Sequence, residues 1–188
     1  MADRNYQDFV KALSEKRENR TFLNSDEDHA LDVLVKLFEI SQKKVRIFAG
    51  SLCKHVGNKP EYVVALSEFI ERGGELCILL NNYDEKCAKS SNLYKRLAYY
   101  KSKGCNVNVK STSAKPYRKA DPEKKEVHFT IGDDMAYRIE TDTEKRTAEC
   151  NFNNPELAKK TAVFFDTLFE NEESKEIDLK KLFDDGDK

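Results

Sequence analysis

Four polar side chains on two expected strands are the candidates for chemistry in this chain: His128, Thr130, Glu149 and Asn151. Side chains alternate across a strand, so His128 and Thr130 share one face of a strand over residues 126–131. By the same alternation, the glutamate and the asparagine share one face of a strand over residues 146–152. If the two polar faces point the same way, they form one candidate catalytic cluster with the imidazole as its reactive group.

The first of these strands resembles the HxKxxxxD motif of the phospholipase D superfamily. The sequence reads His-Phe-Thr-Ile-Gly-Asp-Asp-Met, so His128 is present, Thr130 replaces the lysine and Met135 stands at the aspartate position. Two acidic residues lie near that position but out of register: Asp133 and Asp134. In the family a segment ending in Gly-Ser-x-Asn follows, and here Ala-Glu replaces Gly-Ser while the asparagine is kept as Asn151.

The resemblance implies a loss of activity. In this family the histidine attacks phosphorus to form a phosphohistidine, while lysine and asparagine hold the phosphoryl oxygens, so positive charge is needed at the transition state. Replacement of the lysine by Thr130 removes that charge, and a nearby Glu149 carboxylate repels a phosphodiester unless it is protonated. We therefore interpret the motif as degenerate and expect a non-catalytic binding or regulatory module, with a phosphate-containing ligand, in a bacterial cytoplasm.

One alternative is a phosphodiesterase or nuclease. It keeps His128 as the nucleophile and Asn151 as the oxyanion donor. The missing cation would come from Lys124, Arg138 or a second copy of the chain. Because single halves of this superfamily commonly pair, the resemblance also implies a homodimer or another protein partner.

A second alternative is a nucleic-acid-binding module that uses the basic loop 110–125. This segment has no periodicity, its lysines and arginine can contact phosphates, and Tyr117 can stack on a base. The candidate binding residues are Lys115, Arg118, Lys119 and Lys124, together with Arg138 from a strand expected at residues 135–140. A further histidine, His55, lies just after the strand expected at residues 45–50, and Cys53 lies beside it. The spacing of these two residues alone does not make a catalytic dyad.

The elements that position these residues alternate first between strand and helix. Apolar strands are expected at residues 45–50, 75–80 and 106–110. With helices between them, these strands imply right-handed crossovers and a parallel sheet. Three closely spaced strands follow, at residues 126–131, 135–140 and 146–152, and should form an antiparallel meander. We therefore expect an α/β phospholipase D-like sandwich: a mixed sheet with parallel βα repeats, then an antiparallel meander, flanked by helices.

The chain divides into three expected parts. Residues 1–24 form an amphipathic helical segment, 25–170 the phospholipase D-like domain, and 171–188 an acidic tail that is either loose or docked as a short helix. Ser25 is the expected cap of the first helix of the domain.

Composition sets limits on partners and compartment. With 33 basic and 34 acidic side chains, no global field drives the chain onto nucleic acid or an anionic membrane. The five scattered cysteines lack CxxC spacing, so we expect reduced thiols in a cytoplasm and no metal or other cofactor. The longest apolar runs fall far short of the roughly 20 residues that span a bilayer, so no membrane partner is expected.

Overall fold

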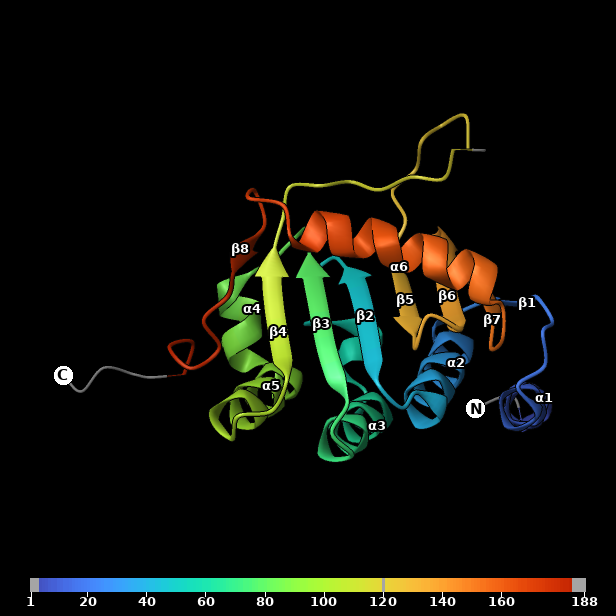
Figure 1. Cartoon of the computed structure of the whole chain (residues 1–188), viewed down its shortest axis with the longest axis horizontal. Coiled ribbons are helices and arrows are strands. Elements are labelled where there is room, and N and C mark those ends of the chain that lie inside the picture. Colours follow the sequence, from blue (N-terminus) through green and yellow to red (C-terminus); the bar gives the residue numbers. More distant parts are fainter. Residues whose placement is uncertain (1–3, 120, 184–188) are drawn as a thin grey trace.

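The computed structural model describes residues 4–119 and 121–183, which form one mixed sheet of eight strands (Figure 1). The spatial order of the strands is β1-β7-β6-β5-β2-β3-β4-β8. Their bounds are β1 Phe22–Asn24, β2 Lys44–Ala49, β3 Glu75–Leu80, β4 Val107–Ser111, β5 Phe129–Gly132, β6 Ala136–Asp142, β7 Thr147–Asn151 and β8 Lys175–Glu176.

The sheet has a parallel half and an antiparallel half. Strands β2, β3 and β4 pair in parallel, whereas β5 lies antiparallel to β2 and begins the meander β5-β6-β7. The predicted fold class, with parallel βα repeats followed by an antiparallel meander and flanking helices, is confirmed.

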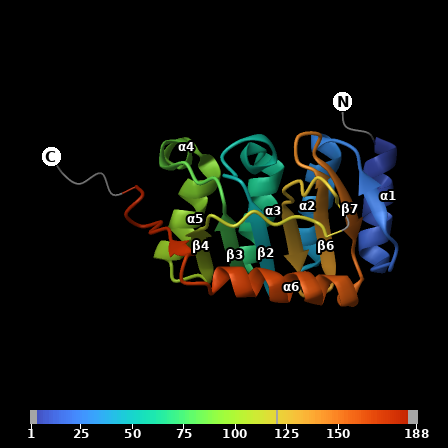
Figure 2. The same ribbon diagram turned by 90° about the horizontal axis from the view of Figure 1, so that it is seen from above.

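Helices cover both faces of the sheet (Figure 2). Helix α6 lies alone along one face, and α1, α2, α3 and α5 lie against the other. The helices are α1 Arg4–Lys16, α2 Glu27–Ile40, α3 Pro60–Glu71, α4 Glu85–Ser90, α5 Asn92–Ser102 and α6 Pro155–Phe169, with a turn of 3₁₀ helix at His55–Asn58. The cap of α2 is Asp26, whose side chain accepts the N–H of His29, so the expectation of Ser25 was wrong by one residue.

Each face of the sheet packs against its helices through a separate hydrophobic core. Val45 and Ile47 of β2 belong to the core under α1, α2, α3 and α5, while Phe48 belongs to the core under α6. A central parallel strand is covered on both faces, which explains why β2 reads as a nearly continuous apolar run.

Both flanking segments extend the sheet at its edges. Strand β1 pairs with β7, and β8 pairs with β4. Leu179 and Leu182 then pack into the larger core, so the tail docks through a two-residue strand and turns as far as residue 183. The expected boundaries at residues 24 and 170 fall inside this continuous sheet, and the three-part division stays a prediction.

The turn between β5 and β6 is fastened to the start of β2. The Asp133 carboxylate accepts the backbone N–H groups of residues 42–44. Next to it, Asp134 pairs with Arg46, and Arg46 also donates two hydrogen bonds of 2.8 Å to Asp166 of α6. The two acids near the aspartate position of the motif therefore join the meander to β2 and α6, at the end of β5 away from the histidine.

We expect Asp133→Ala to lower the free energy of unfolding by about 1–3 kcal/mol, because it leaves backbone donors at the start of β2 without their acceptor. The matched control is Asp121→Ala, since Asp121 also accepts two backbone N–H groups but only within its own loop. Its loss should stay within about 0.5 kcal/mol. Urea denaturation measures both, and equal losses would contradict the role given to Asp133.

Candidate functional site

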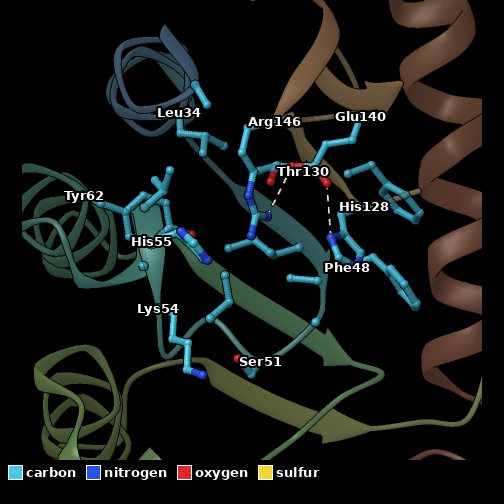
Figure 3. Close-up of a pocket in the computed structure, with 18 of the residues that line it drawn as sticks. Leu34, Phe48, Ser51, Lys54, His55, Tyr62, His128, Thr130, Glu140 and Arg146 are labelled. Atoms are coloured by element: carbon cyan, nitrogen blue, oxygen red, sulfur yellow. Dashed lines mark ion pairs between the residues drawn. The ribbon is translucent and has the colours of Figure 1, made fainter. Parts of the chain in front are cut away.

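A pocket of about 350 Å³ opens at the carboxyl end of β2 (Figure 3). The loop after β2 supplies Gly50, Ser51, Lys54 and His55 to it, and Asn82 and Asp84 come from the loop after β3. The meander supplies His128, Thr130, Arg138, Glu140 and Arg146. The parallel half and the meander thus meet at a strand end, which is where ligand sites gather in open α/β sheets.

His128 lies between two carboxylates. Its Nε2 is 2.9 Å from Oε1 of Glu126, and its Nδ1 is 3.1 Å from Oε2 of Glu140. The ring lies against Gly50, where an added Cβ would be 3.6 Å from its Cε1, and 6.3 Å from the ring of Phe48. An imidazole donates to one such acceptor when neutral and to both when protonated, so both ring nitrogens are occupied by the protein itself.

Glu140 is the buried centre of this arrangement. Its side chain is 4% exposed, and Nη1 of Arg138, itself 5% exposed, lies 3.1 Å from Oε1. Burial raises the pKa of Glu140, but the hydrogen bond from His128 and the charges of Arg138 and His128 outweigh burial and hold the pKa below its usual value. Glu140 is therefore an anion at neutral pH that orients His128.

Each nitrogen of the Arg138 guanidinium donates one hydrogen bond to a neighbour. Arg138 donates to the Asn24 side chain at 3.0 Å, to Glu140, and to the backbone carbonyl of Arg146 at 3.1 Å. The predicted binding residue Arg138 therefore lies at the site, with its guanidinium held by the protein.

The rim of the pocket carries basic side chains on left-handed backbone. Arg146 Nη1 lies 3.8 Å from Glu140, and His55 Nδ1 lies 3.0 Å from Glu27. Leu52, His55 and Arg146 all have positive φ, of 57°, 55° and 59°. Such backbone costs energy for residues other than glycine and is concentrated at binding and catalytic sites.

The structure does not bring the four predicted catalytic side chains together. Thr130 pairs with Arg138, which pairs with Cys150, so these side chains share the face of the pocket. Glu149 pairs instead with Ile139 and lies on the face under α6. Its carboxylate there accepts hydrogen bonds from the side chains of Arg118 and Tyr137, each at 2.9 Å.

Asn151 lies on that opposite face too, because it pairs with Tyr137. Its amide is buried and donates to the side chains of Asn19 and Thr21. The expected cluster of His128 and Thr130 with Glu149 and Asn151 is therefore not formed, since the register of β6 and β7 sends the two polar pairs to opposite faces.

The basic loop passes over the carboxyl ends of β3 and β2 (Figures 1 and 2). Arg118 is anchored on Glu149, and the Lys124 ammonium lies 5.5 Å from the ring centre of Tyr117. Lys115 and Lys119 are exposed. None of these four basic residues lines the pocket, so the loop is a separate surface.

Sequence reasoning missed three residues that matter most here: Glu126, Glu140 and Arg146. A signal for Glu140 was present, because Arg138 and Glu140 alternate with apolar residues along β6 just as His128 and Thr130 do along β5. Glu126 and Arg146 stand at strand ends, where alternation gives no direction. Cys53 is buried, and burial, followed by the neighbouring Cys87 thiol, raises its pKa to about 12, so it does not supply a thiolate nucleophile.

Comparison with solved structures identifies the fold. The phospholipase D family member Nuc from Salmonella typhimurium matches over 84% of this chain and 99% of its own, with a TM-score of 0.56 and 14% identity. NucT from Helicobacter pylori matches over the same shares, with a TM-score of 0.57 and 15% identity. The archaeal chromatin protein TrmBL2 matches over 92% of this chain and 62% of its own, with a TM-score of 0.56 and 12% identity.

The sequence itself matches no protein-family model and no curated protein. The chain therefore has the phospholipase D-like fold, as the motif resemblance implied, at a sequence distance that shows the fold alone. None of the helices among residues 4–119 and 121–183 is long and apolar enough to cross a bilayer.

We expect Glu140→Gln to reduce the loss of unfolding free energy that occurs when the pH is lowered. A carboxyl whose pKa is lowered by folding stabilises the protein above its unfolded pKa, about 4.3 for glutamate, and that stability is lost as pH falls through the folded pKa. Unfolding free energies of both proteins between neutral pH and pH about 3 measure the difference.

The variant should be less stable than wild type at neutral pH and converge toward it in acid. Asp142→Asn is the control, since the pKa of Asp142, at the end of β6, is also lowered, first by the backbone N–H of Lys145. Parallel curves for wild type and Glu140→Gln would contradict the assignment.

Proposed function

We propose that the chain is a phospholipase D-like domain that binds an anionic, phosphate-containing ligand and does not hydrolyse it. The observation that carries this proposal is the position of His128, whose two ring nitrogens lie 2.9 and 3.1 Å from carboxylate oxygens. A histidine that attacks phosphorus needs a free nitrogen directed at the phosphorus atom, and Glu126 and Glu140 occupy both.

The charges next to the histidine also favour binding over turnover. Thr130 supplies no cation, and the guanidinium of Arg138 is neutralised by Glu140 and held by two further acceptors. A phosphoryl transfer transition state needs cations placed on its oxygens, and the inner pocket has no such excess of positive charge.

The rim supplies what an anion needs. Lys54, His55 and Arg146 line the mouth, and Lys145 lines the adjoining depression that shares His55, His128 and Arg146 with the pocket. Figure 3 shows Lys54 and His55 across the pocket from His128, with Arg146 between the two sides. A phosphate group that enters between them meets donors from two sides, and the left-handed backbone of His55 and Arg146 supports a site that is built for a ligand.

A second candidate function is binding of single-stranded nucleic acid by the basic loop. The observation that favours it is the exposed aromatic ring of Tyr117, 48% exposed, next to Lys115 and Lys119 on one loop. Aromatic rings that stack on bases among cations are typical of such surfaces. The structure of the fold neighbour TrmBL2 is described as showing a novel mode of DNA binding.

The proposal places the protein in a bacterial cytoplasm as a homodimer or with a protein partner. All five cysteines are free, which agrees with a reducing compartment. Val163 and Phe164 of α6 are 67% and 44% exposed and offer an apolar surface to a partner.

We expect no release of product from a chromogenic phosphodiester or from single-stranded DNA by the wild type, and none by His128→Ala. The physical reason is the occupied imidazole and the neutralised inner pocket. The oligomeric mass of the same samples is also measured, so that a lack of activity caused by a missing dimer is told apart from an inactive site. Turnover by the wild type that disappears in His128→Ala would replace the proposal with a phosphodiesterase that lacks the lysine.

We expect Arg146→Gln to weaken the binding of inorganic phosphate about tenfold or more, the usual effect of losing one charge-assisted hydrogen bond. The matched variant Lys119→Gln removes one positive charge from the loop and should leave phosphate affinity unchanged. Titration calorimetry with phosphate and fluorescence anisotropy with single-stranded DNA measure both variants. Salt-dependent DNA affinity that Lys119→Gln lowers and Arg146→Gln does not would favour the second function instead.

A further inference from the structure

Glu126 and Glu140 hold the same imidazole in different ways. Glu140 is 4% exposed, sits within β6 and is fixed by Arg138, so its contact with Nδ1 belongs to the rigid sheet. The Glu126 side chain is 32% exposed and precedes β5 at the end of the basic loop. One partner of His128 is therefore buried and fixed, and the other lies at the solvent side.

The backbone around Glu126 has few ties to the sheet. An isolated bridge joins it to Tyr117, and the Val127 N–H donates to the carbonyl of Pro116, while Arg118 ties the loop to Glu149 of β7. At its start, the loop is held by the Asn81 amide, which donates to the Ala114 carbonyl. The carboxylate that covers Nε2 is on a partly exposed side chain that can turn toward solvent, whereas Glu140 is buried in β6 and held by Arg138.

The position of the Glu126 carboxylate is also informative. His128 lines both the pocket and the adjoining depression, and so do Arg146 and His55, so its ring lies where an anion at the mouth would enter. A carboxylate oxygen 2.9 Å from Nε2 occupies the place that an oxygen of an anionic ligand would take there.

We propose that Glu126 is an internal competitor for the ligand: its carboxylate covers Nε2 of His128 and lowers the affinity of the pocket for an anion until the Glu126 side chain turns away. This inference rests on the proposed binding function and adds its regulation. When Glu126 turns away, Nδ1 still lies 3.1 Å from Glu140, and Nε2 can donate its proton to an oxygen of the ligand.

The first readout is chemical and needs no ligand. Diethyl pyrocarbonate modifies accessible imidazole nitrogens, and peptide mass spectrometry separates the adduct at His128 from those at His29 and His55, which serve as internal references. We expect the rate at His128 to rise about threefold to tenfold in Glu126→Ala, the factor that corresponds to one partly exposed charged contact. The reference histidines should react as in the wild type.

The second readout is the affinity for inorganic phosphate, which should tighten in Glu126→Ala by a similar factor. Glu123→Ala is the matched control. It removes one carboxylate from the same loop, so the net charge changes equally, but Glu123 pairs with Lys125 and not with His128. Glu126→Asp keeps the charge but shortens the side chain, and it should behave like Glu126→Ala at His128.

The outcomes separate the two claims. If Glu126→Ala and Glu123→Ala match each other in both readouts, the competitor role is overturned. If the reactivity of His128 rises only in the Glu126 variants while no protein binds phosphate, the covering role stands and the proposed ligand class fails. Thermal unfolding of each variant, measured alongside, confirms that the comparison is made on folded protein.

Discussion

The buried contact between Arg138 and Glu140 is the interaction on which the pocket depends. Both side chains are almost fully removed from water, and a buried charge is tolerated only where it is paired with an opposite charge. Here Arg138 reaches Asn24 of β1 and the Arg146 carbonyl, while Glu140 reaches His128. One ion pair thus joins the edge strand, the meander hairpin and the histidine, which explains why the segment before α2 belongs structurally to the site.

The sequence was enough to predict the architecture because its signals are local. Apolar runs such as that of β2 and the turn sequences of the meander identify strands without reference to partners, and the order of elements then restricts the topology. The short strands β1 and β8 were missed, since two or three residues paired at a sheet edge leave no periodic pattern. The helix α4 was missed because its six residues are too few to show a helical period. The partner strand, and not the residues of Phe22–Asn24 themselves, makes that segment a strand.

The site was predicted only in part because its geometry depends on register. His128 and Thr130 were placed on one face correctly, but whether Glu149 joins them depends on which residue of β6 lies opposite it. A shift of one position exchanges the two faces of a strand, and composition does not specify that shift. In the structure Ile139 lies opposite Glu149, so the polar residues that complete the pocket are those of β6 and not those of β7.

The same ion pair bears on what the pocket is for. Buried ion pairs add little stability compared with well-packed apolar residues of the same volume, so stability alone does not account for charges at the floor of an open pocket. A fixed anion behind an imidazole orients the ring and keeps a donor directed outward, which is useful to a ligand site whether or not a bond is broken.

What separates binding from catalysis here is the remaining charge. Glu126 and Glu140 face the histidine and Glu140 neutralises Arg138, so the basic side chains left for a ligand lie at the rim, where they can hold an anion but do not surround a reacting phosphorus.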